Sequence, residues 1–372
     1  MSVSPLSAAT ASFTDRVARL HAELARDGVP MADMRRAPSL ELAMAGVPDV
    51  GARPAPRSAG VEPLEGPIEA RPVAPLPVGA SRLRYFLDGA QRTLPCWRVG
   101  LAPVIATIAA AAVLRRDAAG RCDIVPGTLR LEHAWLIPRR LDDPRLSPII
   151  DRIEAAGGRI VDTLALDPSE APDAAEPVVA DYARLVELAY AAGLKVRNTL
   201  ESDLLRDWAA NPTPAVDEEW IVVDGRLHTA VPRAIGLVKQ FADTYLGGGD
   251  AETLLGLLPG HRTTAFHPTD RFRGVGLDPE GGGPGPDART LWYLRLWDAA
   301  GLDARHALIR IEAGPDVRET ARIDELSAWL MAERTPRAVA DARWATLLYP
   351  VHYLERILKR RLEADTRGWP GA

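Results

Sequence analysis

The chain has 372 residues, enough for two domains or for one large domain with appendages. Hydrophobic residues make up 47% of it, charged residues 26%, and the net charge is −5, which excludes a wholly disordered chain and a uniformly basic DNA-coating protein. The first residues form no basic segment followed by an apolar run, and the apolar stretch 99–114 is too short to span a bilayer. We therefore expect a cytoplasmic protein that does not contact membranes, with Cys96 and Cys122 as reduced thiols.

Two segments precede the predicted main domain. Apolar residues at helical spacing predict an N-terminal helix within residues 1–27, ending at Asp27-Gly28. Residues 28–80 contain ten prolines and no aromatic residue, so we expect a Pro-rich irregular arm without regular sheet. The folded domain is then expected over residues 81–372.

Within that domain, strand-like and helix-like segments alternate, which predicts a mixed α/β fold. The apolar stretch 99–114 is expected as a buried element of its core. The predicted strands cover residues 83–88, 128–138, 159–166 and 220–223, with a strand pair at 291–297 and 306–312. The predicted helices cover residues 148–156, 181–192 and 197–210, with C-terminal helices at 327–329 and 344–362.

Several catalytic motifs are absent from the sequence. It contains no P-loop, no dinucleotide-binding glycine pattern, no GxSxG elbow and no HExxH pair. Carboxylates remain as the candidates for catalysis, and oxygen ligands suit magnesium or manganese better than zinc or copper.

Two apolar segments run directly into an Asp-Gly pair, at Asp88-Gly89 and at Asp224-Gly225. Each pair taken alone is typical of a hairpin turn. Together they predict two acids at the rim of a sheet, where a divalent cation can bind.

Such a site needs a third acid, and Glu201 on the helix 197–210 is the first candidate. A glutamate in the first turn of a helix is also favoured by the helix dipole alone. Asp203, Glu187 and Glu132 are the fallback candidates.

The order of these segments resembles that of the NurA nucleases. The resemblance covers about residues 82–361 and consists of the strand ending in Asp88-Gly89, the helix that carries Glu201, the segment IVVDG with Asp224, the segment IGLVK ending at Lys239, and then YLRLW and ALIRIE. Each motif is short, and their order is the specific part.

The resemblance implies an RNase H-like mixed sheet with flanking helices and a manganese- or magnesium-dependent deoxyribonuclease. Asp88, Glu201 and Asp224 would then hold the metal, and Lys239 would neutralise the scissile phosphate. The resemblance also implies a homodimer that processes DNA ends with a HerA-like hexameric ATPase. Lys239 alone is equally explained as a lysine reaching from an apolar strand to solvent.

The sequence departs from the family in its closing segment. Thr335 and Arg343 stand where the family carries a tyrosine and a histidine, and Tyr349 and His352 are the candidates to replace them. This departure argues against efficient cleavage and favours an alternative, a catalytically inactive adaptor that docks a motor ATPase or DNA ends. A third alternative is an unrelated globular protein whose Asp-Gly pairs are turns.

Other cations are candidates for contact with a DNA backbone. They are His267, Arg271 and Arg273, in a segment expected as a solvated loop, and the run Lys359-Arg360-Arg361. That run is also explained as a cationic cluster that favours a helix end.

Overall fold

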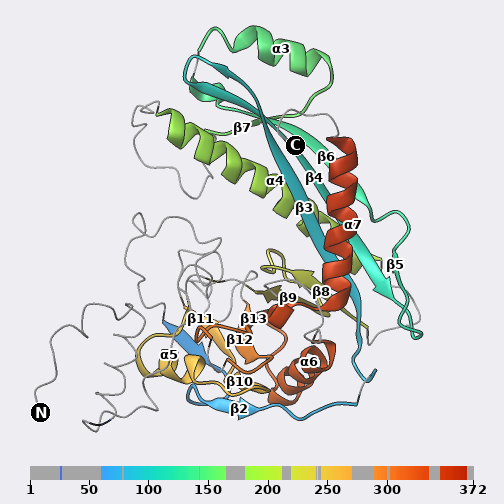
Figure 1. Cartoon of the computed structure of the whole chain (residues 1–372), viewed down its shortest axis with the longest axis vertical. Coiled ribbons are helices and arrows are strands. Elements are labelled where there is room, and N and C mark those ends of the chain that lie inside the picture. The colour runs from blue at the N-terminus through green and yellow to red at the C-terminus, as the bar shows by residue number, and fades with distance from the viewer. Residues whose placement is uncertain are drawn as a thin grey trace, which may run out of the picture. The chain divides into compact units, whose positions relative to one another are not determined.

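The fold is taken from a computed structural model (Figure 1). The structure describes Arg26 and residues 60–77, 79–141, 143–164, 181–211, 219–239, 241, 244–269, 289–299, 302–334 and 344–366. The chain divides into two compact units, one of Met1–Gly51 with Ala299–His306 and one of Ala52–Asp298 with Ala307–Ala372. All strands and helices named below belong to the second unit.

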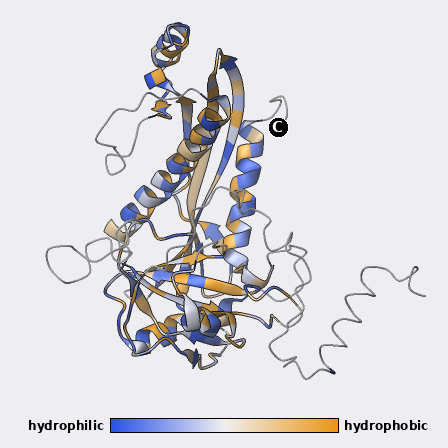
Figure 2. Cartoon of the chain, turned by 90° about the vertical axis from the view of Figure 1, so that its left-hand side faces the viewer, coloured by the Kyte–Doolittle hydropathy of each residue, from blue (hydrophilic) through white to orange (hydrophobic). Residues whose placement is uncertain are grey.

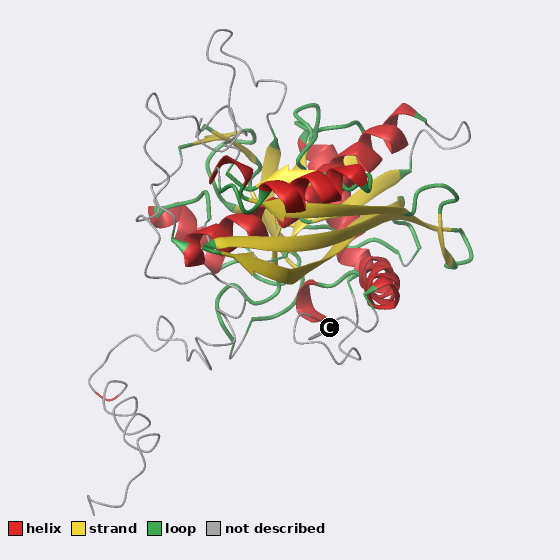
Figure 3. Ribbon diagram, turned by 90° about the horizontal axis from the view of Figure 1, so that it is seen from above, coloured by secondary structure: helices red, strands yellow, loops and turns green. Residues whose placement is uncertain are grey.

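The described part of this unit is a mixed sheet with helices on both sides (Figure 3). The strands are β1 (Val61–Pro63), β2 (Ala70–Pro72), β3 (Leu83–Val99), β4 (Ala102–Arg116), β5 (Cys122–Ile124), β6 (Arg130–Ile137), β7 (Ile160–Asp162), β8 (Trp220–Asp224), β9 (Ala234–Val238), β10 (His261–Thr263), β11 (Phe266–Pro268), β12 (Thr290–Arg295) and β13 (Leu308–Ala313). The helices are α3 (Ser147–Ala155), α4 (Tyr182–Ala210), α5 (Gly248–Leu255), α6 (Thr320–Glu333) and α7 (Tyr349–Asp365), with short 3-10 turns η3 (Arg139–Leu141) and η6 (Trp344–Thr346). The predicted mixed α/β fold is confirmed.

The strand order is β1-β11-β12-β13-β9-β8-β3-β4-β6-β7. Three strands lie off this path: β5 pairs with β4, β10 pairs with β12, and β2 pairs with β10. In its centre, β3, β4 and β6 form an antiparallel meander, and β8 and β9 then run parallel to β3. The helix α4 lies in the connection that returns the chain from β7 to β8.

The two faces of β3 and β4 are covered by different helices. Alternate residues of a strand point to opposite faces, so Phe86 packs in the cluster that contains the apolar side of α7, while Leu87 packs in the cluster that contains α4. Four consecutive buried alanines, 109–112, let both helices approach β4 closely. Figure 2 shows hydrophilic and hydrophobic residues around α7, as an amphipathic helix requires.

Several predicted elements are confirmed. They are the strands at 128–138 (β6) and 220–223 (β8), the antiparallel pair at 291–297 and 306–312 (β12 and β13), the buried element at 99–114 (β4) and the helix at 148–156 (α3). The strand predicted at 159–166 is shorter, and the helix predicted at 344–362 begins at Tyr349. The segment 327–329 belongs to the longer helix α6. The N-terminal helix lies outside the described residues except for Arg26.

The two helices predicted at 181–192 and 197–210 are one continuous helix, α4, and the stop predicted at Gly193 was wrong. A Cβ added at Gly193 would lie 3.2 Å from Thr93 Oγ1 and 3.3 Å from Leu136 Cδ1. This glycine therefore allows the helix to pack closely on the sheet instead of ending it.

The Asp-Gly pair at Asp88 is neither a hairpin turn nor the end of a strand. The prediction that a strand ends at Asp88 was therefore wrong. β3 continues for ten further residues past Gly89 and pairs with β4 along its length. The strand continues because β4 supplies backbone partners on one edge, even though β8 ends on the other.

The expectation of an irregular arm over residues 28–80 was wrong for residues 60–80, and the domain does not begin at residue 81. β1 pairs with β11 and β2 pairs with β10. These strands need no aromatic residues, because backbone hydrogen bonds and the buried ion pair between Glu65 and Arg262 attach them to the sheet. Residues 28–59 lie outside the described part of the chain.

Among the described residues, no helix is long and apolar enough to cross a membrane.

Candidate functional site

The site forms where β8 ends beside β3. The last paired residues of these parallel strands are Leu87 and Val223, and Asp88 and Asp224 come next on each strand. Since parallel neighbours in register point to the same face, both aspartates project on the face that α7 covers. The structure therefore places Asp88 and Asp224 on neighbouring strands at one edge.

Glu201 approaches the neighbouring residue, Gly89, from α4, which covers the other face of β3. Its carboxyl group occupies the space that a side chain at position 89 would fill, because a Cβ added at Gly89 would overlap Glu201 Oε1. The glycine after Asp88 thus serves to admit a buried glutamate and not to make a turn. Asp88 and Glu201 are each only 5% exposed.

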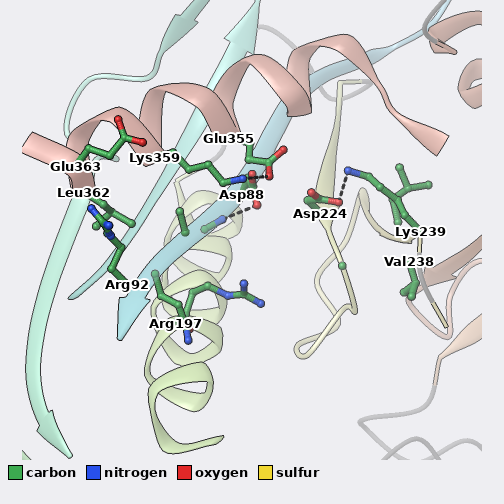
Figure 4. Close-up of a pocket in the computed structure, with 15 residues that line it drawn as sticks. Asp88, Arg92, Arg197, Asp224, Val238, Lys239, Glu355, Lys359, Leu362 and Glu363 are labelled. Atoms are coloured by element: carbon green, nitrogen blue, oxygen red, sulfur yellow. Dashed lines mark hydrogen bonds and ion pairs between the residues drawn. The ribbon is translucent and has the colours of Figure 1, made fainter. Parts of the chain in front are cut away.

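Asp88 and Asp224 border a pocket of about 590 Å³, whereas Glu201 does not line it (Figure 4). β3 supplies Asp88 and Arg92 to its lining, α4 supplies Arg197, and the ends of β8 and β9 supply Asp224 and Lys239. α7 closes one side with Glu355, Lys359, Leu362 and Glu363. Carboxylates and cations thus converge from both helices and from three strands.

Asp88 is a buried acid with an unused oxygen. Its Oδ1 accepts a hydrogen bond from the Gly89 backbone N–H at 2.8 Å, whereas its Oδ2 is buried with no hydrogen-bond partner. Burial raises the pKa of Asp88 well above its ordinary value, and Asp224, Glu201 and Glu355 raise it further against the opposing charge of Lys239. Several negative groups therefore act on one poorly solvated carboxyl.

Glu201 experiences the same environment. Burial raises its pKa to about 7, with repulsion from Asp224 adding to the effect and Arg197 opposing it. Arg197 Nε lies 3.3 Å from Glu201 Oε1.

We expect the variant Glu201→Gln to be more thermostable than the wild type above pH 7 and no more stable at pH 4, measured with EDTA present. A carboxyl whose pKa is raised in the folded state binds its proton more tightly there, so its contribution to stability is present below its ordinary pKa of 4.5 and is lost as the pH rises through about 7. The measurement is the melting temperature of both proteins from pH 4 to pH 8.5. Asp203→Asn, an exposed acid on the same helix, is the control and should leave the pH profile unchanged. A Glu201→Gln profile parallel to that of the wild type would contradict the prediction.

Lys239 is held against one of the acids and does not extend to solvent. Its Nζ lies 2.7 Å from Asp224 Oδ1, and its side chain is only 9% exposed. The lysine therefore neutralises part of the negative charge at the open end of β8 and faces the pocket (Figure 4).

Sequence reasoning missed Glu355, Arg92 and the contribution of α7. Glu355 lines the pocket and its charge acts on Asp88, while Lys359 Nζ lies 2.7 Å from Glu355 Oε1. The spacing of Glu355, Lys359 and Glu363 at every fourth residue would have placed them on one side of a helix. Nothing in the sequence indicated that this side meets β3.

The fallback acids do not reach the site. Asp203 and Glu187 pair on the surface of α4 with Arg206 and Arg184, and Glu132 on β6 pairs with Arg159. None of the three lines the pocket.

His267 is part of β11 and not of a solvated loop. It is buried, and its Nδ1 lies 3.0 Å from the Arg289 carbonyl oxygen, so it is not available to a DNA backbone. Arg271 and Arg273 lie outside the described residues, as do Thr335 and Arg343.

The two residues expected to replace the family's tyrosine and histidine are placed differently. Tyr349 is exposed at the start of α7 and does not line the pocket. His352 Nδ1 lies 3.8 Å from Glu355 Oε2, so the histidine is beside a pocket acid.

The donor atoms suit a hard divalent cation, but their present positions do not surround one. The buried Asp88 Oδ2 without a partner is the kind of atom that a cation would satisfy, and all the acids offer oxygen. Yet within the described ranges no group of three or more His, Cys, Asp or Glu side chains stands ready to hold a metal ion. Binding a cation at Asp88 therefore requires neighbouring carboxylates to turn toward it.

No protein-family model and no curated protein matches this chain.

Proposed function

We propose that this protein is a metal-dependent nuclease that hydrolyses the phosphodiester bonds of DNA at the pocket beside Asp88. The observation that carries the proposal is the buried Asp88 Oδ2, which has no hydrogen-bond partner and lies next in register to Asp224, with Glu201 behind Gly89. A mixed sheet with a helix on each face, and acids on adjacent strands, supports the RNase H-like fold that the NurA resemblance implies.

The proposed roles follow from position and charge. Asp88, Glu201 and Asp224 would hold manganese or magnesium. Such a cation would polarise the scissile phosphate and lower the pKa of a bound water. Lys239, Arg197 and Lys359 face the same pocket, where their charges attract and orient the phosphodiester backbone.

The acidic net charge of −5 supports the further proposal that DNA is delivered by partners. We propose a homodimer, which would bring two sets of pocket cations to one DNA, and a HerA-like hexameric ATPase that raises the local concentration of DNA ends.

We expect the purified protein to degrade DNA with manganese or magnesium, to be inactive in EDTA, and to be several-fold faster with a HerA-like ATPase and ATP. The reason is that the carboxylates at this site repel a phosphate unless a cation lies between them. The measurement is release of labelled nucleotides from linear DNA in these four conditions. Cleavage that is indifferent to EDTA would place the chemistry elsewhere.

The second candidate is a catalytically inactive adaptor that docks a motor ATPase or DNA ends. The ion pair between Lys239 and Asp224 favours it, because an oxygen of that acid is already occupied by an ammonium group. An adaptor would raise the activity of the ATPase while leaving DNA intact with manganese, which distinguishes the two functions in the same assay.

A further inference from the structure

Two exposed tyrosines stack on each other at the start of α7. The rings of Tyr349 and Tyr353 have centroids 6.4 Å apart and planes inclined by only 8°. Tyr349 is 57% exposed and Tyr353 37% exposed, so the pair is not part of the core. Two adjacent exposed rings offer flat faces on which another aromatic ring can stack.

Two exposed arginines continue the same side of the helix. Residues three or four apart share one side of a helix, so Tyr349, Tyr353, Arg356 and Arg360 form a single row, here called the α7 row. Both arginines are exposed, and no ion pair joins either of them to another described residue. Their charge is therefore available to a phosphate backbone.

The α7 row runs beside the pocket. The same turns of the helix that carry it also place Glu355, Lys359 and Glu363 in the pocket lining (Figure 4). A nucleic-acid strand bound along the row would thus lie on the helix that also borders the pocket. That position suits a substrate-binding surface better than an isolated contact.

We propose that the α7 row binds single-stranded nucleic acid, with bases stacked on the tyrosine rings and phosphates on Arg356 and Arg360. Aromatic rings next to cations are the usual means of holding unpaired strands. A duplex hides the faces of its bases except at its ends, so the tyrosine rings discriminate between single-stranded and double-stranded nucleic acid. This inference rests on the proposed nuclease function and names the form of DNA that the pocket receives.

The test is fluorescence anisotropy with labelled oligo-deoxythymidine and with a labelled hairpin duplex, both in EDTA so that no cleavage occurs. We expect the double variant Tyr349→Leu/Tyr353→Leu to bind the single strand about tenfold more weakly or worse, because each stacked base contributes substantially to affinity. Its weak binding of the duplex should not change. Tyr349→Phe/Tyr353→Phe keeps the rings and should bind the single strand like the wild type.

A matched control is available on α4. Tyr182 and Tyr190 are also exposed, at 43% and 44%, but neither forms a stacked pair with a described residue. Their replacement by leucine should leave single-strand binding unchanged. Circular dichroism of all variants checks that the fold is intact.

The arginines are tested through salt. In Arg356→Gln/Arg360→Gln, the plot of log affinity against log salt should become shallower by about 1.4, since each phosphate contact on a single strand contributes about 0.7 to the slope. An unchanged slope would remove the arginines from the proposal.

Single-strand affinity that survives loss of both rings, or an equal loss for the duplex, would overturn the proposal. So would the absence of any single-strand binding by the wild type, which would assign the row to another partner. Because binding is measured without metal, intact ring-dependent binding together with absent cleavage would refute the nuclease and not the α7 row.

Discussion

We expect Asp88→Asn to reduce manganese-dependent DNA cleavage by at least about tenfold, equivalent to about 1.4 kcal/mol of activation barrier. The substitution keeps the size of the side chain and removes its negative charge. Asp88 is the central acid of the site, because its Oδ2 is buried without a partner and the charges of three other acids act on it. The measurement is the initial rate of DNA degradation at saturating manganese.

The same variant should fold and should be at least as stable as the wild type in EDTA. Burial disfavours the charged form of Asp88, and Asp224 and Glu201 repel it. The ionised carboxyl therefore lowers the stability of the folded protein at neutral pH. Loss of cleavage with an equal or higher melting temperature would therefore separate a functional role from a structural one.

The control is Asp123→Asn, which removes a carboxylate from an exposed position on β5, away from the pocket lining. It should change neither cleavage nor stability. Full cleavage by Asp88→Asn would refute the proposed site, and a lower melting temperature would make Asp88 a structural residue.

The sequence indicated the acids of this site for partly incorrect reasons. Asp88 and Asp224 each precede a glycine after an apolar run, a pattern that predicts an acid at a strand end, and both lie in the pocket. However, only Asp224 ends a strand, while β3 continues past Asp88. The glycine at 89 is required by Glu201 on α4, a contact between residues more than a hundred positions apart that no local pattern contains.

The contribution of α7 could not be predicted for a related reason. The sequence shows an amphipathic helix, and Leu354 and Leu358 identify its buried side. The position of Glu355 beside Asp88 depends on which face of the sheet the helix covers. That is set by the connections between elements and follows only from the fold.

Strands β1 and β2 could not be predicted because backbone pairing, which leaves little trace in composition, attaches them to the sheet.

A polar contact also secures these strands, and it leads to the second large prediction. The side chain of Arg262 is 0% exposed and that of Glu65 is 1% exposed. Arg262 donates from Nη1 and Nη2 to the two Glu65 oxygens at 2.7 and 2.8 Å, and from Nε to Asp324 at 2.7 Å. Burial opposes ionisation of Glu65, yet the hydrogen bonds from Arg262 and from the Ala265 backbone N–H bring its pKa below the ordinary value.

We expect Glu65→Ala to lower the free energy of unfolding by about 3–5 kcal/mol, because it leaves a buried guanidinium without its main partner. Urea denaturation measures this loss. Glu69→Ala removes the acid of an exposed pair with Arg71 and should cost no more than about 1 kcal/mol.

The double variant Glu65→Leu/Arg262→Met should recover most of the loss, since apolar groups of similar size can replace a buried ion pair. In Glu65→Ala, residues 60–80 should also become sensitive to limited proteolysis, because the ion pair that joins them to β10 is gone.

The ion pair stabilises the wild type above the ordinary pKa of Glu65 and loses its effect as the pH falls through the lower pKa of the folded state. The difference in unfolding free energy between the wild type and Glu65→Ala should therefore shrink in acid. A difference that is small at pH 7, or that grows in acid, would show that backbone pairing alone holds β1 and β2 on the sheet.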